Sequence, residues 1–266
     1  MERVDATLES SKRVGHFRSV SDVANWARPV DRLVGGATPE GAVNLNVDGR
    51  HLTGPIQGFG RMWHKRHQIS LGAELAPDDV IGVWKSHFGD FWPRGNYFYG
   101  PITALEPGDV AVLNLDMPGG TRLSTGVMVL YADAESFTLM TPEGHLFAGW
   151  ITFSSFVENG ITVAQAEILM RASDPVFEIG MELMGHRREN RFWEKTLMLL
   201  AAYFGINATA HTEVECIDNN YQWERALNVW QNSAIRTGLF QMTKPVRRGV
   251  NFARKSLDEH WSVDAR

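Results

Sequence analysis

The order of secondary-structure signals between residues 102 and 204 constrains the fold more than any other feature of this sequence. Residues 102–172 hold short apolar segments separated by turns, which fall at Pro118–Gly120, Thr141–Gly144 and Glu158–Gly160. Strands at such regular spacing favour an antiparallel meander. Residues 174–204 then form one long segment with an apolar side, which is typical of a helix that covers a core. The order predicts a sheet covered by a single long helix.

The strands expected in this meander span 110–115, 122–131, 136–140, 145–156 and 161–171. In the second strand, alternation places four residues on one face, namely Leu123, Val127, Val129 and Tyr131. In the last strand, one face carries Ala164, Ala166, Ile168 and Met170, and the other carries Gln165, Glu167 and Arg171. This pattern predicts one buried and one wet face, with Glu167 and Arg171 pointing outward. If they faced inward instead, they could hold the polar group of a ligand.

The long helix has clear signals at both ends. Asp174 is a favourable N-cap and Pro175 a favourable first residue. Gly205 suits the position after the helix. A polar patch at 186–191 interrupts its apolar side. A helix of about 30 residues would be roughly 45 Å long.

A strand and a shorter helix precede the meander. Residues 61–71 read as a strand. A helix begins at Pro77, with Asp78 and Asp79 in its first turn, and ends at Gly89. Residues 91–101 are rich in aromatic residues and contain two prolines and two glycines, so we expect neither helix nor strand there.

This order resembles the helix-grip fold of the START-related SRPBCC superfamily. The stretch Thr141-Pro-Glu-Gly-His-Leu-Phe-Ala-Gly-Trp-Ile-Thr-Phe is similar to the Gly-His…Gly…Phe motif of an uncharacterised branch, described only as a domain of unknown function. The resemblance covers roughly residues 60–205. It implies an α+β fold in which a curved antiparallel sheet grips a long C-terminal helix around a hydrophobic cavity. It implies a lipid-like or polycyclic ligand but no particular activity, because the superfamily includes carriers, cyclases, hydrolases and regulators.

Three regions follow from this organisation. Residues 1–60 form an irregular N-terminal extension, with a short helix from Ser21 through Ala27 in an otherwise loose wrap. Residues 61–205 form the helix-grip ligand-binding domain, and residues 206–266 form a C-terminal helical, basic extension.

An excess of Trp and Phe is compatible with two kinds of protein interior. The chain has 9 Trp, 14 Phe and 5 Tyr. These rings either fill an unusually aromatic core or line an apolar cavity. Five rings could form the mouth of such a cavity, or simply pack between the first helix and the sheet: Trp84, Phe88, Trp92, Tyr97 and Tyr99. Trp150 and Phe153 should fall on opposite faces of their strand, so at most one faces a cavity.

Few polar residues suggest chemistry. His145 follows a turn beside Glu143, and a His next to a carboxylate can act as a general base. The alternative is a turn His that hydrogen-bonds the backbone. Arg122 could hold the polar group of a ligand if it faces inward. The predicted ligand-binding residues are therefore Trp84, Phe88, Trp92, Tyr97, Tyr99, Arg122, His145 and Trp150. A cyclase or hydrolase using His145 as acid/base is the enzymatic alternative.

Other classes are disfavoured. The net charge of −5 does not suit a nucleic-acid clamp, and the single cysteine, Cys216, cannot form an intramolecular disulfide. His64 and His67 make a poor metal pair, because strand residues three apart face opposite ways. Phosphate-binding loops, dinucleotide fingerprints and hydrolase elbows are missing from the sequence. We expect no metal, no cofactor and no nucleic-acid partner.

Met1–Glu9 lacks the apolar core of a secretory signal, so a cytoplasmic location is expected.

The C-terminal extension carries a strand signal at 211–217 and a helix signal at 221–240. Between residues 236 and 255 the sequence has basic residues and no acidic ones; the basic residues are Arg236, Lys244, Arg247, Arg248, Arg254 and Lys255. A basic amphipathic stretch favours contact with a membrane surface. One alternative is a solvated helix that docks its apolar side on the domain. Nucleic-acid contact is the other, which the interleaved apolar residues disfavour. Arg236, Lys244, Arg247 and Arg248 are the candidate membrane contacts.

Overall fold

The computed structural model describes residues 22–35, 44–101, 103–117, 120 and 122–242. Within these residues, nine strands form one antiparallel sheet: β1 (Leu52–Thr53), β2 (Met62–Ser70), β3 (Tyr97–Tyr99), β4 (Val110–Asp116), β5 (Arg122–Ala132), β6 (Ser136–Pro142), β7 (Phe147–Glu158), β8 (Ile161–Ala172) and β9 (His211–Asp218). Their spatial order is β3-β4-β5-β6-β7-β8-β2-β9, with β1 beside β6. The predicted meander and the strands at 61–71 and 211–217 are confirmed.

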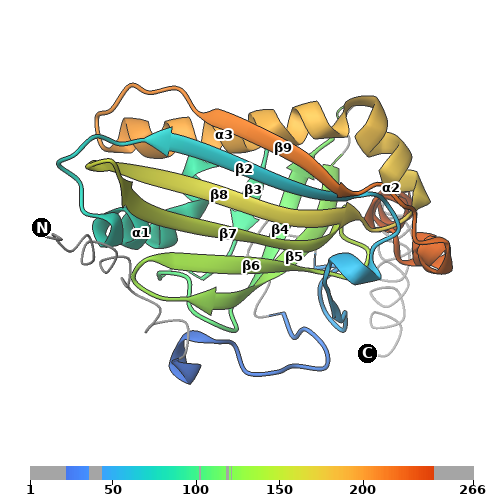
Figure 1. The fold of residues 1–266 in the computed structure, drawn as a ribbon. Coiled ribbons are helices and arrows are strands. Elements are labelled where there is room, and N and C mark those ends of the chain that lie inside the picture. The colour runs from blue at the N-terminus through green and yellow to red at the C-terminus, as the bar shows by residue number, and fades with distance from the viewer. Residues whose placement is uncertain (1–21, 36–43, 102, 118–119, 121, 243–266) are drawn as a thin grey trace, which may run out of the picture.

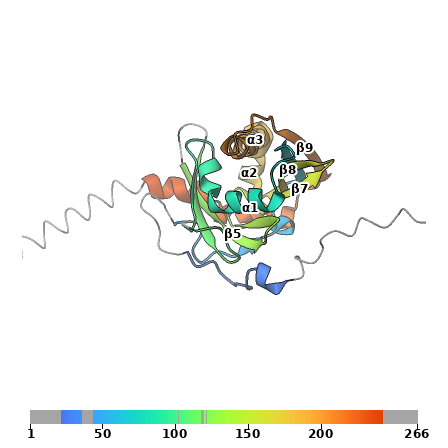
Figure 2. The same ribbon diagram turned by 90° about the vertical axis from the view of Figure 1, so that its left-hand side faces the viewer.

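The helices include α1 (Pro77–Ser86), α2 (Pro175–Gly180), α3 (His186–Tyr203) and residues 233–242, and the 3-10 turns include η1 (Val23–Asn25), η2 (Pro55–Gln57), η3 (Phe88–Phe91) and η6 (Trp223–Gln231). Figure 1 shows the long, curved strands with α3 along β2 and β9. In the end-on view of Figure 2, α1 lies inside the curve and α3 lies over its open side. The predicted α+β architecture, a curved sheet gripping a long helix, is therefore what the chain forms.

The long helix is interrupted. A π-helical turn, η5 (Met181–Gly185), joins α2 to α3, so the predicted long helix forms between its expected ends but is not α-helical throughout. A π turn inserts an extra residue and shifts the helical register. Both predicted ends are confirmed: Asp174 accepts hydrogen bonds from the amides of Val176 and Phe177 at 2.8 and 3.1 Å, and Gly205 has a φ of +74°.

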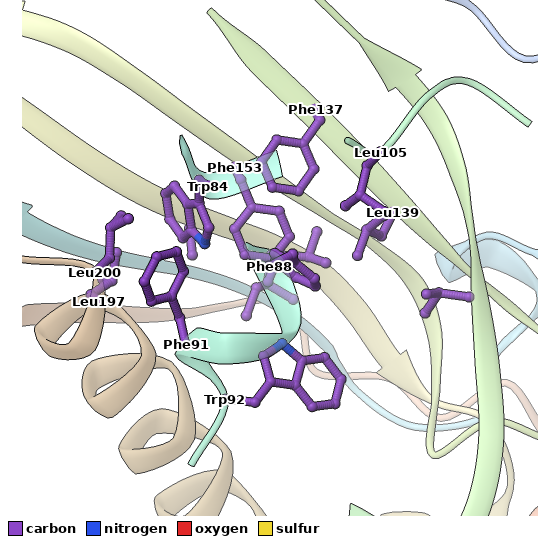
Figure 3. Packing of buried hydrophobic residues seen from close by; sticks show 14 of the residues in the cluster. Trp84, Phe88, Phe91, Trp92, Leu105, Phe137, Leu139, Phe153, Leu197 and Leu200 are labelled. Carbon is purple, nitrogen blue, oxygen red and sulfur yellow. The ribbon is translucent and has the colours of Figure 1, made fainter. Parts of the chain in front are cut away.

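One end of the concave face is filled by aromatic rings. Trp84 from α1 is fully buried and lies 5.0 Å, between ring centroids, from Phe153 of β7. Phe137 of β6 stacks on Phe153 at 4.7 Å, and Phe88 meets both rings edge to face. Figure 3 shows these rings between α1 and the sheet, with Leu197 and Leu200 of α3 beside them. We refer to this part of the interior as the packed end.

Backbone pairing changed two predictions about strands. Tyr97–Tyr99 was expected to be irregular, yet it forms the edge strand β3, in which Phe98 lies opposite Leu113 of β4. An edge strand needs backbone pairing on one side only, so the nearby prolines do not prevent it. In β5 the register shifts between Val129 and Tyr131. Tyr131 therefore leaves the face of Val129 and packs on Trp26 at 4.8 Å.

The inner face of β8 is as predicted, since its alanines, Ile168 and Met170 are buried in the core. The outer face is less wet than expected. Arg171 is only 2% exposed, because its guanidinium donates to the carbonyls of Gly60 and Asn220 at 2.6 and 2.9 Å and pairs with Asp218. Gln165 is also buried. Segments on either side of the helix-grip unit thus cover part of this face, which alternation could not reveal.

Element boundaries also moved. α1 ends at Ser86 rather than Gly89, and Gly89 lies in η3. β6 continues to Pro142 and β7 begins at Phe147, so His145 precedes the strand it was expected to lead. The short N-terminal helix is a 3-10 turn capped by Asp22; Ser21 lies outside the described residues.

The C-terminal helix predicted at 221–240 is two helical segments, η6 and residues 233–242. Asn232 separates them. Its amide group donates to Asp174 at 2.8 Å, and its carbonyl oxygen accepts from the amides of Ala234 and Ile235. This side chain caps a new helix and ends the preceding turn. Arg236 is described and half-buried, whereas Lys244, Arg247, Arg248, Arg254 and Lys255 lie outside the described residues.

Candidate functional site

A cavity of about 340 Å³ lies between the concave face of the sheet and the α2–η5–α3 segment. This volume is near the lower end of the range of small-molecule sites, about 300–1,000 Å³. Its lining is mainly apolar, with contributions from strands β4, β5, β6 and β8 and from the helical cover: Leu113, Leu115, Val127, Leu139, Ile168, Met170, Phe177, Met181, Phe192 and Trp193. We call this part of the interior the cavity end.

Three of the predicted ligand-binding residues border the cavity: Trp92, His145 and Trp150. Trp92 is 8% exposed, and its indole N–H finds no hydrogen-bond partner in the described part of the chain. Trp84 and Phe88 belong instead to the packed end and do not line the cavity.

The other three predicted residues lie together on the opposite, convex face. Tyr97 and Tyr99 stack at 6.1 Å, and the Arg122 guanidinium lies 5.5 Å from the centre of the Tyr97 ring. Tyr99 packs on a small outer cluster that includes Leu33 and Met128. The five rings therefore do not form one group, because neighbours along β3 point to alternate faces.

His145 is held by the backbone. Its Nδ1 lies 3.1 Å from the Phe147 amide nitrogen and 3.2 Å from the Phe147 carbonyl oxygen, so the backbone of one residue holds the ring. Burial lowers the pKa of His145 to about 4, so the ring is neutral near pH 7. Glu143 contacts the His51 amide instead, at 3.4 Å. None of the hydrogen bonds of His145 runs to a carboxylate, so the His145–Glu143 pair of the enzymatic alternative does not form.

The motif that includes His145 has a structural explanation. Gly144 has a φ of +79°, and a Cβ there would overlap the carbonyl of Gln231 in η6. A Cβ on Gly149 would overlap the carbonyl of Leu169 in the neighbouring strand. Phe153 is fully buried at the packed end. Close approach of the backbone therefore accounts for the two glycines, and packing accounts for the Phe.

The exposed rim of the cavity combines an ion pair with an apolar side chain. Arg188 of α3 donates to the Asp116 carbonyl at 2.7 Å and lies 3.3 Å from its carboxylate. Leu183 of η5 borders the cavity and is 75% exposed. The rim thus joins the end of β4 to the helical cover beside a projecting Leu.

A buried polar cluster lies at the wall formed by α3 and β2. The Lys65 ammonium, which is fully buried, donates to Glu189 Oε2 and, at 2.8 Å, to Asn190 Oδ1. Glu189 borders the cavity with a side chain that is 9% exposed. Burial raises the pKa of Glu189, and the Lys65 charge and the Trp193 indole counteract this shift.

Two histidines adjoin this cluster. Burial, together with the Lys65 charge, lowers the pKa of His67 to about 3. Burial and the charges of Lys65 and Arg61 lower the pKa of His186 to about 4. His186 packs on Trp63 at 4.5 Å, and neither of its ring nitrogens has a hydrogen-bond partner among the residues that the structure describes.

The sequence reasoning missed Glu189, Lys65 and His67. A usable signal existed in the predicted strand, where alternation puts Lys65 and His67 on the same face as Trp63 and Ile69. The same alternation sends His64 to the outer face, where its Nε2 lies 2.7 Å from Glu167. Among the described residues, no three His, Cys, Asp or Glu side chains are grouped as metal ligands.

No described helix is both long enough and apolar enough to cross a bilayer. No protein-family model and no curated protein matches the chain.

Several solved structures are similar to it. The di-domain ARO/CYC StfQ from the steffimycin biosynthetic pathway has a TM-score of 0.43 and 10% sequence identity. The match covers 54% of this chain and 50% of StfQ, so this chain spans only half the length of that protein. Ms6760 from Mycobacterium smegmatis has a TM-score of 0.39 and 14% identity; the match covers 53% of this chain and 89% of that one. Truncated norcoclaurine synthase from Thalictrum flavum has a TM-score of 0.37 and 12% identity; the match covers 54% of this chain and 93% of that one. At these TM-scores the likenesses carry no weight for function, and the helix-grip arrangement rests on the sheet and helices described above.

Proposed function

We propose that this protein binds a hydrophobic small molecule or lipid in the cavity between the sheet and the long helix. The observation that carries the proposal is an apolar space of about 340 Å³ beside a densely packed ring cluster in the same interior. Apolar surface moved from water into such a space gains about 25 cal/mol per Å². We also propose that the chain belongs to the uncharacterised SRPBCC branch, on the motif at Gly144, His145, Gly149 and Phe153, and that it acts in the cytoplasm.

Native mass spectrometry of the purified full chain tests this function. We expect a co-purified adduct of small mass, or binding of added naphthalene measured by equilibrium dialysis. Ile168→Phe places a ring into the cavity and should lower naphthalene affinity at least tenfold. The Val157→Phe variant is the matched control, because Val157 is exposed on β7. An intact wild-type fold that binds neither a native ligand nor naphthalene would contradict the proposal.

A second candidate function, contact with a membrane surface through residues 221–255, is favoured by η6. Its side chains Trp223, Leu227 and Trp230 are 71%, 74% and 81% exposed. Exposed Trp and Leu next to a basic sequence are typical of interfacial segments. Flotation with vesicles containing anionic lipid should carry the wild type upward but not the W223S/W230S variant. Equal flotation of the two proteins would contradict this candidate.

A further inference from the structure

Hydrogen-bond directions around His67 fix which of its nitrogens carries the proton. The Thr212 hydroxyl donates to Glu194 Oε1 at 2.8 Å, so its only proton is used. His67 Nδ1 lies 2.9 Å from the same hydroxyl oxygen and must therefore donate to it. In the neutral ring, Nε2 is then an acceptor.

This acceptor faces another acceptor. His67 Nε2 lies 4.0 Å from Glu189 Oε1, and neither atom has a hydrogen-bond partner within the described part of the chain. A separation of 4.0 Å is too long for a shared proton. A buried acceptor without a donor is costly, and more so when it is charged, so Glu189 Oε1 is the atom that calls for a donor from outside the chain.

The position of Glu189 connects this gap to the cavity. Its side chain is nine-tenths buried and borders the cavity, while Lys65 occupies its other oxygen. The Trp193 indole also interacts with this carboxylate, yet Oε1 still has no hydrogen-bond partner among the described residues.

The charges around the gap select the donor. The Lys65 ammonium is already present there, so a second cation would meet like-charge repulsion at low dielectric. An anion would face Glu189 and the lone pair of His67. The remaining titratable neighbours are His186 and Glu194, and neither supplies a free charge of opposite sign to an anion.

We propose that the cavity ligand carries a neutral hydrogen-bond donor, such as an alcohol or phenol hydroxyl, which donates to Glu189 Oε1 beside His67. The ligand is then an apolar body with one hydroxyl, rather than a fatty acid or an amine. This inference rests on the proposed function, because it names the class of ligand that the same cavity takes.

Matched probes test it on the full chain. 2-Naphthol and naphthalene differ by one hydroxyl, and 2-naphthoate adds a negative charge. Because the hydroxyl makes the probe more polar, a purely apolar cavity would prefer naphthalene. We expect equilibrium dialysis to give 2-naphthol at least about tenfold higher affinity than naphthalene, as befits a hydrogen bond to a charged group, and 2-naphthoate the lowest affinity.

The variant Lys65→Met/Glu189→Leu removes both charges together and leaves no unpaired ion in the core. It should abolish the preference for 2-naphthol while naphthalene affinity changes less than about threefold. Val127→Ala, on β5 and away from β2, should weaken both probes equally. If the double variant does not fold, Glu189→Gln should lower the preference severalfold, because a neutral amide is a weaker acceptor.

The outcomes separate the two proposals. Equal binding of both neutral probes to the wild type, or a preference that survives in the double variant, would overturn this inference and leave the ligand-binding function standing; a water molecule would then fill the gap. Failure of every probe to bind would count against the ligand-binding function itself, and this inference would fall with it.

Discussion

The packed end and the cavity end share one sheet but are filled in different ways. β8 runs through both: its inner face carries Ala164 and Ala166 near the ring cluster, and Ile168 and Met170 beside the cavity. The small alanines leave room for the Trp84 indole from α1. The larger Ile168 and Met170 lie where the helical cover contains the π turn η5. The comparison teaches that the aromatic excess serves both purposes, a tight core at one end and a lined space at the other.

Removal of the Trp84 ring should test the packed end most severely. Trp84→Ala deletes a fully buried side chain whose ring neighbours are held by the sheet, so we expect a loss of about 3–5 kcal/mol in the free energy of unfolding. Urea denaturation measures it. Leu183→Ala, at the exposed rim, should cost less than about 0.5 kcal/mol. Similar losses in both variants would mean that the two ends are packed alike.

Enlarging side chains on β8 sharpens the contrast. Ala164→Leu and Ile168→Phe add the same number of carbon atoms at the two ends of one inner face. Overpacking at Ala164, which is fully buried beneath α1, should cost about 1–3 kcal/mol of stability. Ile168→Phe should cost well under 1 kcal/mol, because the cavity accepts the ring. Denaturation curves of the two variants measure both losses of stability. A larger loss for Ile168→Phe than for Ala164→Leu would contradict the prediction.

Acid should act on the cavity end through His145. Its pKa is about 4 in the folded protein, lowered by burial from an ordinary value of 6.5. The unfolded chain therefore binds the proton first, and stability is lost as pH falls from 6.5 toward 4. Between pH 6.5 and 5.0 this one group should account for about 1.5 kcal/mol.

His145→Gln removes that contribution. Denaturation at the two pH values should show a smaller acid-induced loss in the variant than in the wild type. The residual loss belongs to the other buried histidines, His67 and His186. Identical pH dependence in both proteins would show that His145 is not buried as a neutral ring.

Local patterns in the sequence predicted the strands, the caps at Asp174 and Gly205 and the inner face of β8, because each depends on residues close in the chain. They could not predict that Arg171 is covered, since Gly60 and Asn220 lie far from it in sequence. The ion pair between Glu189 and Lys65 could not be predicted either, because it forms only where α3 packs on β2. The bulge at Tyr131 and the π turn each insert one residue into a regular pattern, and periodicity alone does not mark such insertions.

The smallest effect concerns the glycines that flank the π turn. Gly180 is helical and borders the cavity, and a Cβ there would meet no atom within 4 Å. Gly180→Ala should therefore raise stability by about 0.5–1 kcal/mol through helix propensity. At Gly185 a Cβ would press on Met181 Sδ and lie 3.2 Å from the Gly180 carbonyl, so Gly185→Ala should bring no gain. If both variants were stabilised equally in thermal denaturation, the π turn would not depend on close packing at Gly185. The cavity would then owe its shape to the sheet alone, rather than to the sheet and its interrupted cover together.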